Sequence, residues 1–175
     1  QEGFPAGTDG ERDPLLDHGT LIPLRFLQEE GLGNVPIVRI GLSGLSVEAH
    51  YRLGELIAQT AETLGKRVAV VASGDLSHRL KEDGPYGYAP QGPEFDHLVT
   101  EALGKADFMN LMELAPAFCE QAAECGVRAF LIMAGAFNGK SLGSRLLSYE
   151  GPFGVGYGVA VFSVRGNDAA REFGK

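Results

Sequence analysis

Residues 68–72 constrain this chain more than any other stretch, because five consecutive small and branched apolar residues are typical of a strand covered on both faces. The next six residues, 73–78, are Ser-Gly-Asp-Leu-Ser-His, and their first three favour a turn out of the strand. His78 is therefore predicted on a loop at the carboxyl edge of a sheet, where open α/β proteins keep their chemistry. A histidine there suits proton transfer or metal ligation, because it titrates near neutral pH.

A second histidine precedes a predicted helix. Residues 17–19 are Asp-His-Gly, and the apolar residues that follow have the spacing of one helix face. These apolar residues are Leu21, Leu24, Phe26 and Leu27. His18 is therefore expected at the start of a helix that runs from about residue 20 to residue 30.

Both histidines also have a structural interpretation. Asp75 or Ser77 could cap a short helix, which would leave His78 as a solvated loop residue. His18 could be a hydrogen-bonded imidazole of the core or of a loop. The residues alone leave these alternatives open.

The middle of the chain predicts a βαβ unit. Residues 35–42 have the pattern of a strand, Ser46 is a good N-cap for a helix that Gly65 ends, and residues 68–72 form the second strand. Two strands joined through one helix should lie parallel. Further helices are predicted near residues 94–103, 108–114, 117–124 and 127–137.

Two C-terminal segments, residues 146–149 and 155–164, are predicted as strands that pair antiparallel across a Gly-Pro-Phe-Gly turn. The expected fold class is α/β. We predict one domain over residues 1–175, with a mostly parallel central sheet, helices on both faces and a C-terminal antiparallel strand pair.

Composition narrows the function classes. The 175 residues are 44% apolar, enough for one sizeable core, and the formal net charge of -8 disfavours binding to a phosphate backbone. No run approaches the length of a membrane span, and no charged-then-apolar leader opens the sequence. We expect a cytoplasmic protein that binds neither nucleic acid nor membrane. Residues 1–12 are polar and glycine-rich and are expected to be disordered.

The remaining polar and aromatic candidates are weaker. Cys119 and Cys125 lack the spacing of a zinc site and are expected to be buried free thiols. His50 and His97 fall within predicted helices and are interpreted as helix-surface or interface residues. A serine hydrolase built on Ser43 is disfavoured, because Gly-Leu-Ser-Gly-Leu lacks the second glycine of a nucleophile elbow.

Three segments together resemble one enzyme family. They are Asp-His-Gly-Thr-Leu-Ile-Pro-Leu at residues 17–24, Ser-Gly-Asp-Leu-Ser-His-Arg-Leu at residues 73–80 and Glu-Cys-Gly-Val-Arg at residues 124–128. In this order they resemble the class III extradiol ring-cleavage dioxygenases. The likeness is to the LigB-type catalytic subunit, and more closely to the LigB-like half of the bacterial AmmeMemoRadiSam system protein A.

The resemblance implies a non-haem iron(II) centre that binds a small aromatic diol of the catechol type together with O₂. It implies that His18 and His78 move protons, with Asp17 orienting His18 and Asp75 fixing the loop of His78. Two histidine ligands of the family come from a more N-terminal stretch, so this sequence is expected to be N-terminally incomplete and inactive by itself. Tyr86 and Tyr88 are candidates for one wall of a pocket for a flat aromatic substrate.

The carboxylate ligand is ambiguous. The family places a metal-binding acid near Glu124, whereas the related Memo proteins have a cysteine in the aligned place, which makes Cys125 the alternative. A solvated glutamate and a small buried cysteine are the structural interpretations of these two residues.

Three functions remain open. The first is an iron(II)-dependent extradiol dioxygenase, and the second is a Memo-like metal-binding protein with a redox or peptide-binding role on the same fold. The third is a structural or partner half that is inactive without upstream sequence. For the full-length chain, a homo-oligomer or a partner domain is expected.

Overall fold

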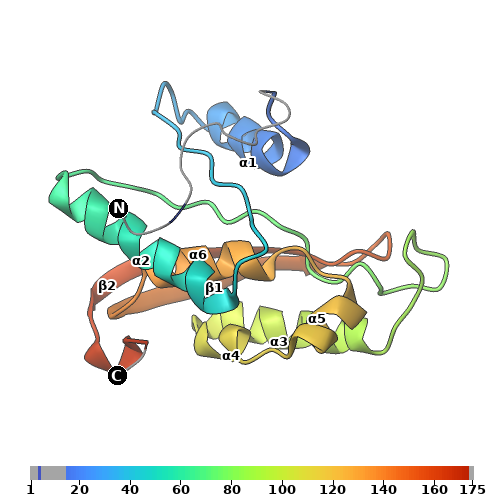
Figure 1. Ribbon diagram of the computed structural model, residues 1–175. Helices are drawn as coiled ribbons and strands as arrows, with labels where there is room; N and C mark the ends of the chain where they lie inside the picture. The colour runs from blue at the N-terminus through green and yellow to red at the C-terminus, as the bar shows by residue number, and fades with distance from the viewer. Residues whose placement is uncertain (1–3, 5–14, 174–175) are drawn as a thin grey trace. The chain divides into compact units, whose positions relative to one another are not determined.

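The computed structural model describes residue 4 and residues 15–173, and by its contacts the chain divides into two compact units, Gln1–Gly44 and Leu45–Lys175. The first unit contains helix α1 (His18–Glu29; Figure 1). The carboxylate of Asp17 caps it by accepting a hydrogen bond from the Thr20 amide at 2.9 Å. The predicted helix is confirmed, with its start two residues earlier, at His18.

The second unit contains the other regular elements. In chain order these are α2 (Val47–Thr63), α3 (Gln91–Lys105), α4 (Met109–Met112), α5 (Pro116–Ala122), α6 (Val127–Ala136), β1 (Lys140–Glu150), β2 (Tyr157–Asn167) and the 3-10 helix η1 (Ala169–Arg171). Ser46 caps α2 as predicted, because its hydroxyl accepts a hydrogen bond from the Ala49 amide at 3.2 Å.

Helices α2 and α6 cross at direct backbone contact (Figure 1). A Cβ atom on Gly54 of α2 would lie 1.9 Å from the carbonyl oxygen of Ile132, and one on Gly135 of α6 would lie 1.9 Å from that of Tyr51. Only glycine therefore fits at either position. The close crossing buries most of α6, which supplies much of the core of this unit.

Strands β1 and β2 form an antiparallel hairpin, which confirms the predicted C-terminal pair, with β1 beginning earlier than expected. Leu142, Ala160 and Phe162 pack against the core, whereas the exposed side chains of β2 include Val159 and Val161. Helix α3 packs against both strands, and the Ser144 hydroxyl of β1 donates to the carbonyl of Leu103 in α3 at 2.7 Å. The hairpin and α3 together hold the loops described below.

The predicted parallel central sheet is not shown. Within the described part of the chain, the β1–β2 hairpin is the one sheet. Residues 35–42 and residues 68–72 are not strands. Val70 and Ala72 pack against the core, but Val68 and Val71 are more than half exposed, so this run is covered on one face rather than on both. An apolar run favours extended backbone, but a strand also needs a hydrogen-bonded neighbour, which the run itself cannot specify.

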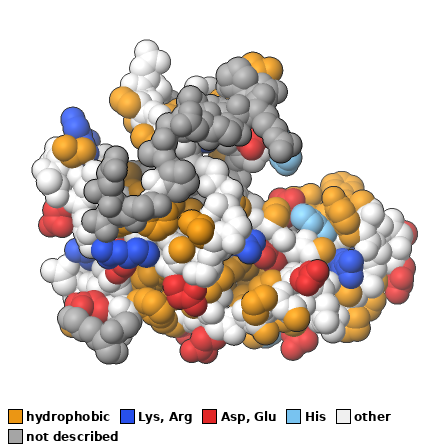
Figure 2. Space-filling view, viewed as in Figure 1, with side chains coloured by type: hydrophobic (Ala, Val, Ile, Leu, Met, Phe, Trp, Pro, Cys, Tyr) orange, Lys and Arg blue, Asp and Glu red, His pale blue; other side chains and the backbone are white. Residues whose placement is uncertain are grey.

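The surface carries both signs of charge. Figure 2 shows acidic and basic side chains spread over the face in view, with apolar side chains between them. None of the described helices is long and apolar enough to cross a membrane. Apart from Phe4, the residues predicted to be disordered, 1–12, lie outside the described part of the chain.

Candidate active site

The loop that carries His78 is hydrogen-bonded along its backbone to two other segments. The Leu76 amide donates to the Gly156 carbonyl at 2.9 Å, and the Gly156 amide donates to the Ser77 carbonyl at 2.8 Å. The amide of His78 donates to the carbonyl of Ala122, the last residue of α5, at 3.1 Å. Leu76 and Ser77 are fully buried, so the loop is packed against the turn of the hairpin.

Two glycines bring this loop against the segment between α5 and α6. A Cβ atom on Gly74 would lie 2.4 Å from the Cα of Gly126, so the two backbones touch. The contact lets the Asp75 amide donate to the Sγ of Cys125 at 3.2 Å. Residues fifty positions apart in the chain therefore meet at a site whose spacing is set by backbone contact.

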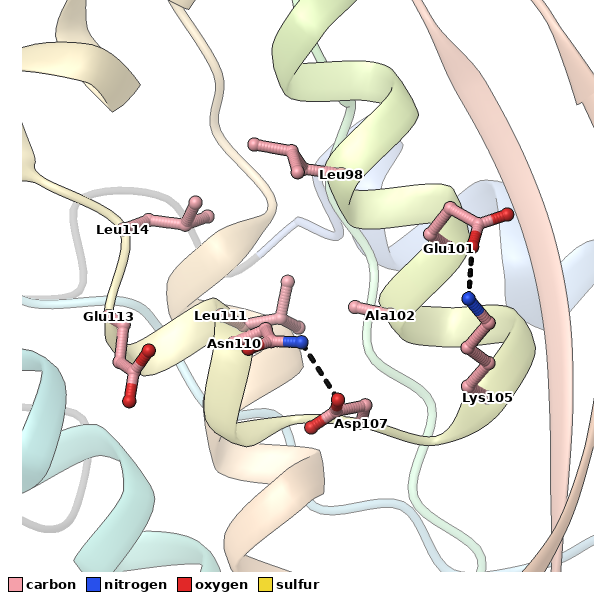
Figure 3. Close-up of a pocket in the computed structure, with 9 residues that line it drawn as sticks. All are labelled: Leu98, Glu101, Ala102, Lys105, Asp107, Asn110, Leu111, Glu113 and Leu114. Carbon is pink, nitrogen blue, oxygen red and sulfur yellow. Dashed lines mark hydrogen bonds and ion pairs between the residues drawn. The ribbon is translucent and has the colours of Figure 1, made fainter.

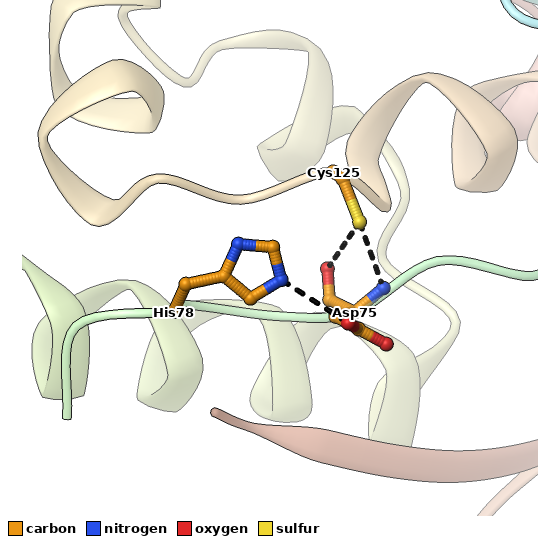
Figure 4. A group of neighbouring side chains, drawn as sticks. All are labelled: Asp75, His78 and Cys125. Atoms are coloured by element: carbon orange, nitrogen blue, oxygen red, sulfur yellow. Dashed lines mark hydrogen bonds and ion pairs between the residues drawn. The ribbon is translucent and has the colours of Figure 1, made fainter. Parts of the chain in front are cut away.

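Asp75, His78 and Cys125 form a cluster with three potential ligand atoms within 4.8 Å of one another (Figure 4). Among the described residues it is the one group of three or more His, Cys, Asp or Glu side chains placed to hold a metal ion. Nε2 of His78 lies 3.1 Å from Oδ2 of Asp75, and Nδ1 points away from Asp75. The carboxylate thereby orients the imidazole.

The segment between His78 and α3, which carries Tyr86 and Tyr88, places an aromatic ring beside this cluster. The ring of Tyr86 stacks on the imidazole of His78, with ring centroids 4.9 Å apart and planes 23° apart. Tyr88 lies across from Leu80 in an isolated antiparallel bridge, and both tyrosines are about half exposed. Tyr86 therefore lies against His78, whereas the role of Tyr86 and Tyr88 as a wall for a substrate stays a prediction.

Glu124 lies beside the cluster but outside it. Helix α5 ends at Ala122 rather than at Glu124 as predicted, and Oε2 of Glu124 accepts a hydrogen bond from the Val127 amide at 2.8 Å. Burial raises the pKa of the Glu124 carboxyl, while its hydrogen bonds to the Val127 and Gly126 amides oppose the shift. The side chain is turned toward the start of α6, where it satisfies amides that have no partner within the helix.

Both described cysteines are free thiols, as predicted, but the expectation that they are buried was wrong. Cys119 is partly buried and Cys125 is exposed, because Cys125 lies in the turn before α6 rather than within a helix. Burial raises the pKa of Cys119 to about 11. Desolvation also raises the pKa of Cys125, although the hydrogen bond from the Asp75 amide opposes the change.

Asp17 and His18, two further candidates from the sequence, belong to the first unit. His18 is the first residue of α1 and is exposed, and the Asp17 carboxylate caps that helix through the Thr20 amide. That hydrogen bond is the main reason why the pKa of Asp17 is lowered. His18 belongs to the unit Gln1–Gly44 and His78 to the unit Leu45–Lys175, so the joint action of the two histidines stays a prediction.

His50 and His97 differ from each other. His50, expected at a helix surface or an interface, is buried within its own unit, and its Nδ1 donates to the Ser46 carbonyl at 2.8 Å in the first turn of α2. His97, on α3, is exposed as expected.

Sequence reasoning missed one buried acid, Asp96 of α3, which is 1% exposed. Its Oδ1 accepts from the Ser77 amide at 2.7 Å and its Oδ2 accepts from the Tyr149 hydroxyl at 2.7 Å. Burial raises the pKa of Asp96, and these two hydrogen bonds oppose the rise. A signal was available: Asp96 adjoins Phe95 and lies three residues before Val99, on the apolar face of the helix.

A cavity of about 340 Å³ lies elsewhere, between α3 and α4 (Figure 3). Four of its polar residues are paired with one another: Lys105 bonds Glu101, and the Asn110 side chain donates to Asp107 at 2.7 Å. None of the residues singled out from the sequence lines it. The chemistry-bearing residues instead gather at the cluster in Figure 4.

Comparison with known proteins supports the motif analysis. A family model described as the catalytic LigB subunit of aromatic ring-opening dioxygenase matches residues 1–160. A Clostridium acetobutylicum protein, CA_C1420, is 38% identical over 157 residues, which are 90% of this chain and 33% of that protein.

Two Escherichia coli relatives carry enzyme names. A 3,4-dihydroxyphenylacetate 2,3-dioxygenase is 27% identical over 111 residues, 60% of this chain and 40% of the enzyme. A 2,3-dihydroxyphenylpropionate/2,3-dihydroxicinnamic acid 1,2-dioxygenase is 38% identical over 69 residues, 37% of this chain and 22% of the enzyme. The chain thus spans less than half the length of each of these relatives.

Proposed function

The chain belongs to the family of the catalytic LigB subunit of aromatic ring-opening dioxygenase, and on this basis we propose that the full-length protein opens the ring of a catechol-type diol with O₂. The proposed centre contains Asp75, His78 and Cys125. Family membership alone does not establish the chemistry, so the proposal depends on what these side chains can do.

The observation that carries the proposal is the convergence at His78. An imidazole that is oriented by one carboxylate, stacked by one aromatic ring and placed near a thiol lies on a loop whose Leu76 and Ser77 are fully buried. Such a group can exchange protons with a bound diol while its position stays fixed.

The donor atoms fit a divalent transition metal. Within the cluster, the Asp75 carboxylate is a ligand that iron(II) accepts, and the Cys125 thiolate would add a softer donor. Of Glu124 and Cys125, the two candidates from the sequence for a metal ligand, the geometry favours Cys125, because the Glu124 carboxylate accepts hydrogen bonds from the amides at the start of α6. A bound metal would supply a place where the diol and O₂ are held together.

We assign proton transfer to His78 rather than metal ligation. Asp75 accepts from Nε2, which leaves Nδ1, on the opposite side of the ring, as the atom that exchanges a proton with a substrate hydroxyl. His18, with Asp17 beside it, is proposed as the second proton-transfer residue, on the strength of the motif at residues 17–24.

The named relatives suggest the substrates to try. Their names specify aromatic diols that carry a carboxylate side chain, 3,4-dihydroxyphenylacetate and 2,3-dihydroxyphenylpropionate. A ring of this kind can stack beside Tyr86, with Tyr88 as a further wall. Oxygen uptake by the iron(II)-loaded full-length protein should be measured with catechol and with both of these acids. We expect uptake together with the yellow absorbance of a ring-opened product, and uptake with none of the three would contradict the proposal.

The ligand assignment gives a direct prediction about metal affinity. Cys125→Ser should weaken iron(II) binding at least about 10-fold, because the change acts on a coordinating atom. Glu124→Gln should leave the affinity nearly unchanged, because glutamine keeps an oxygen that can accept from the Val127 amide. Titration of both variants of the full-length protein with iron(II) checks this. The opposite ranking would make Glu124 the ligand.

The position of Cys125 also favours a second candidate, a Memo-like metal-binding protein without dioxygenase activity. That function predicts stoichiometric metal in the wild-type protein but no oxygen uptake with any diol. Metal content and oxygen uptake, measured on one preparation, separate the two candidates.

A further inference from the structure

Asp96 is connected to the His78 loop through a short chain of hydrogen bonds. Its Oδ1 accepts from the amide of Ser77, the residue directly before His78, at 2.7 Å. The Ser77 hydroxyl donates to the carbonyl of Ala122 at 2.8 Å and accepts from the Arg79 amide at 2.9 Å. Asp96 and Ser77 therefore fix the backbone on both sides of His78 and touch none of the reacting groups proposed above.

The other oxygen of Asp96 ties the same point to the hairpin. Oδ2 accepts from the hydroxyl of Tyr149 on β1 at 2.7 Å. The carboxylate also closes tightly on Gly156, where a Cβ atom would lie 1.9 Å from Oδ2. Gly156 in turn exchanges backbone hydrogen bonds with Leu76 and Ser77. One buried side chain thus joins α3, the hairpin and the His78 loop.

We propose that Asp96, held by Tyr149, is a positioning residue. It keeps the imidazole of His78 hydrogen-bonded to Asp75 and stacked on Tyr86. The inference rests on the proposed proton-transfer role of His78. Burying a carboxylate costs free energy unless its oxygens accept hydrogen bonds. A neutral apolar residue would fill the same space between α3 and β1 without that cost. The two bonds that satisfy Asp96 are the ones that place the His78 loop against the hairpin.

Tyr149→Phe in the full-length protein is the main test, because it removes one hydroxyl and no packing. We expect a fall in kcat of about 10-fold to 100-fold, with KM and iron content nearly unchanged, as for other residues that orient a catalytic group. Asp96→Asn keeps an oxygen for the Ser77 amide and should lose less turnover than Asp96→Ala, which removes both contacts.

Ser144→Ala is the matched control. Ser144 also joins β1 to α3 through a hydrogen bond of 2.7 Å, but its partner is the Leu103 carbonyl at the far end of the helix. Tyr149→Phe and Ser144→Ala should lower the melting temperature by similar amounts, and Tyr149→Phe alone should lower kcat. Equal losses of kcat in both variants would show that Asp96 and Tyr149 act only through stability.

The same changes in a His78→Gln background show whether the pair acts through His78. If it does, Tyr149→Phe costs no further turnover once His78 is gone, whereas independent effects multiply. Multiplying effects would overturn the inference and leave the proposed function standing.

A readout without turnover keeps the two proposals distinguishable. In NMR spectra of histidine-labelled protein, assigned through His78→Gln, Tyr149→Phe should shift the side-chain signal of His78 and Ser144→Ala should not, because the stacking on Tyr86 makes that signal sensitive to ring position. An unshifted signal in Tyr149→Phe would refute the positioning role even if the wild-type protein cleaved no diol.

Discussion

His78→Gln should lower ring-cleavage turnover of the full-length protein by about 10²–10⁴-fold, the usual contribution of a general acid or base. Glutamine preserves the size and some hydrogen bonding of the side chain but cannot titrate near neutral pH. Iron content and KM should change little, because the proton is transferred in the transition state and binding does not need it. The pH profile of turnover should lose one limb. Iron content and kcat, measured on one preparation over a pH series, check this prediction.

His97→Gln is the matched control, since His97 is an exposed histidine on α3 away from the cluster. It should leave turnover and iron content unchanged. If His78→Gln were purified without iron, His78 would be a ligand. If it kept both its iron and its turnover, His78 would be an ordinary loop residue.

Gly74→Ala should both destabilise the protein and disturb the metal cluster. The new methyl group would lie 2.4 Å from the Cα of Gly126 and 3.0 Å from the carbonyl oxygen of Cys125, so one backbone segment has to move. Overpacking of this kind costs about 1–3 kcal/mol. The shift also separates Asp75 from Cys125, so iron(II) affinity should fall at least about 10-fold. Denaturant unfolding and iron(II) titration measure the two effects.

Gly166→Ala provides the comparison for this change. Gly166 is exposed near the end of β2, and a Cβ atom there would meet nothing within 4 Å. We expect a stability within about 0.5 kcal/mol of wild type and unaltered iron binding. If Gly74→Ala behaved like Gly166→Ala, the backbone contact would not set the geometry of the site.

Local features of the fold were predictable from the sequence because neighbouring residues determine them. Ser46 caps α2 as its side chain suggested, and the hairpin forms across the Gly-Pro-Phe-Gly turn. The prediction of a strand at residues 68–72 was wrong, because a strand depends on more than its neighbouring residues. Its extended preference is local, whereas pairing depends on residues elsewhere in the chain.

The site was predictable only in part. The Ser-Gly-Asp-Leu-Ser-His motif identified Asp75 and His78, which lie three residues apart and meet through a turn. That Cys125 rather than Glu124 faces them depends on the contact of Gly74 with Gly126, fifty-two positions along the chain, and no local pattern encodes it. Asp96 was missed although it lies on the apolar face of α3, because an acid is rarely fully buried unless it is paired, and its partners Ser77 and Tyr149 lie far from it in the chain.

The backbone bonds between the His78 loop and Gly154–Gly156 bear on how the protein fluctuates. Most loops open locally, and their amide protons exchange with solvent long before the core unfolds. Here the amides of Leu76, His78 and Leu80 are bonded to carbonyls of the hairpin turn and of α5. The loop can therefore open only when the hairpin turn and α5 open with it. The amide protons of Leu76, His78 and Leu80 should exchange with solvent as slowly as those of the hairpin. The geometry of the Asp75, His78 and Cys125 cluster then persists for as long as this part of the protein stays folded.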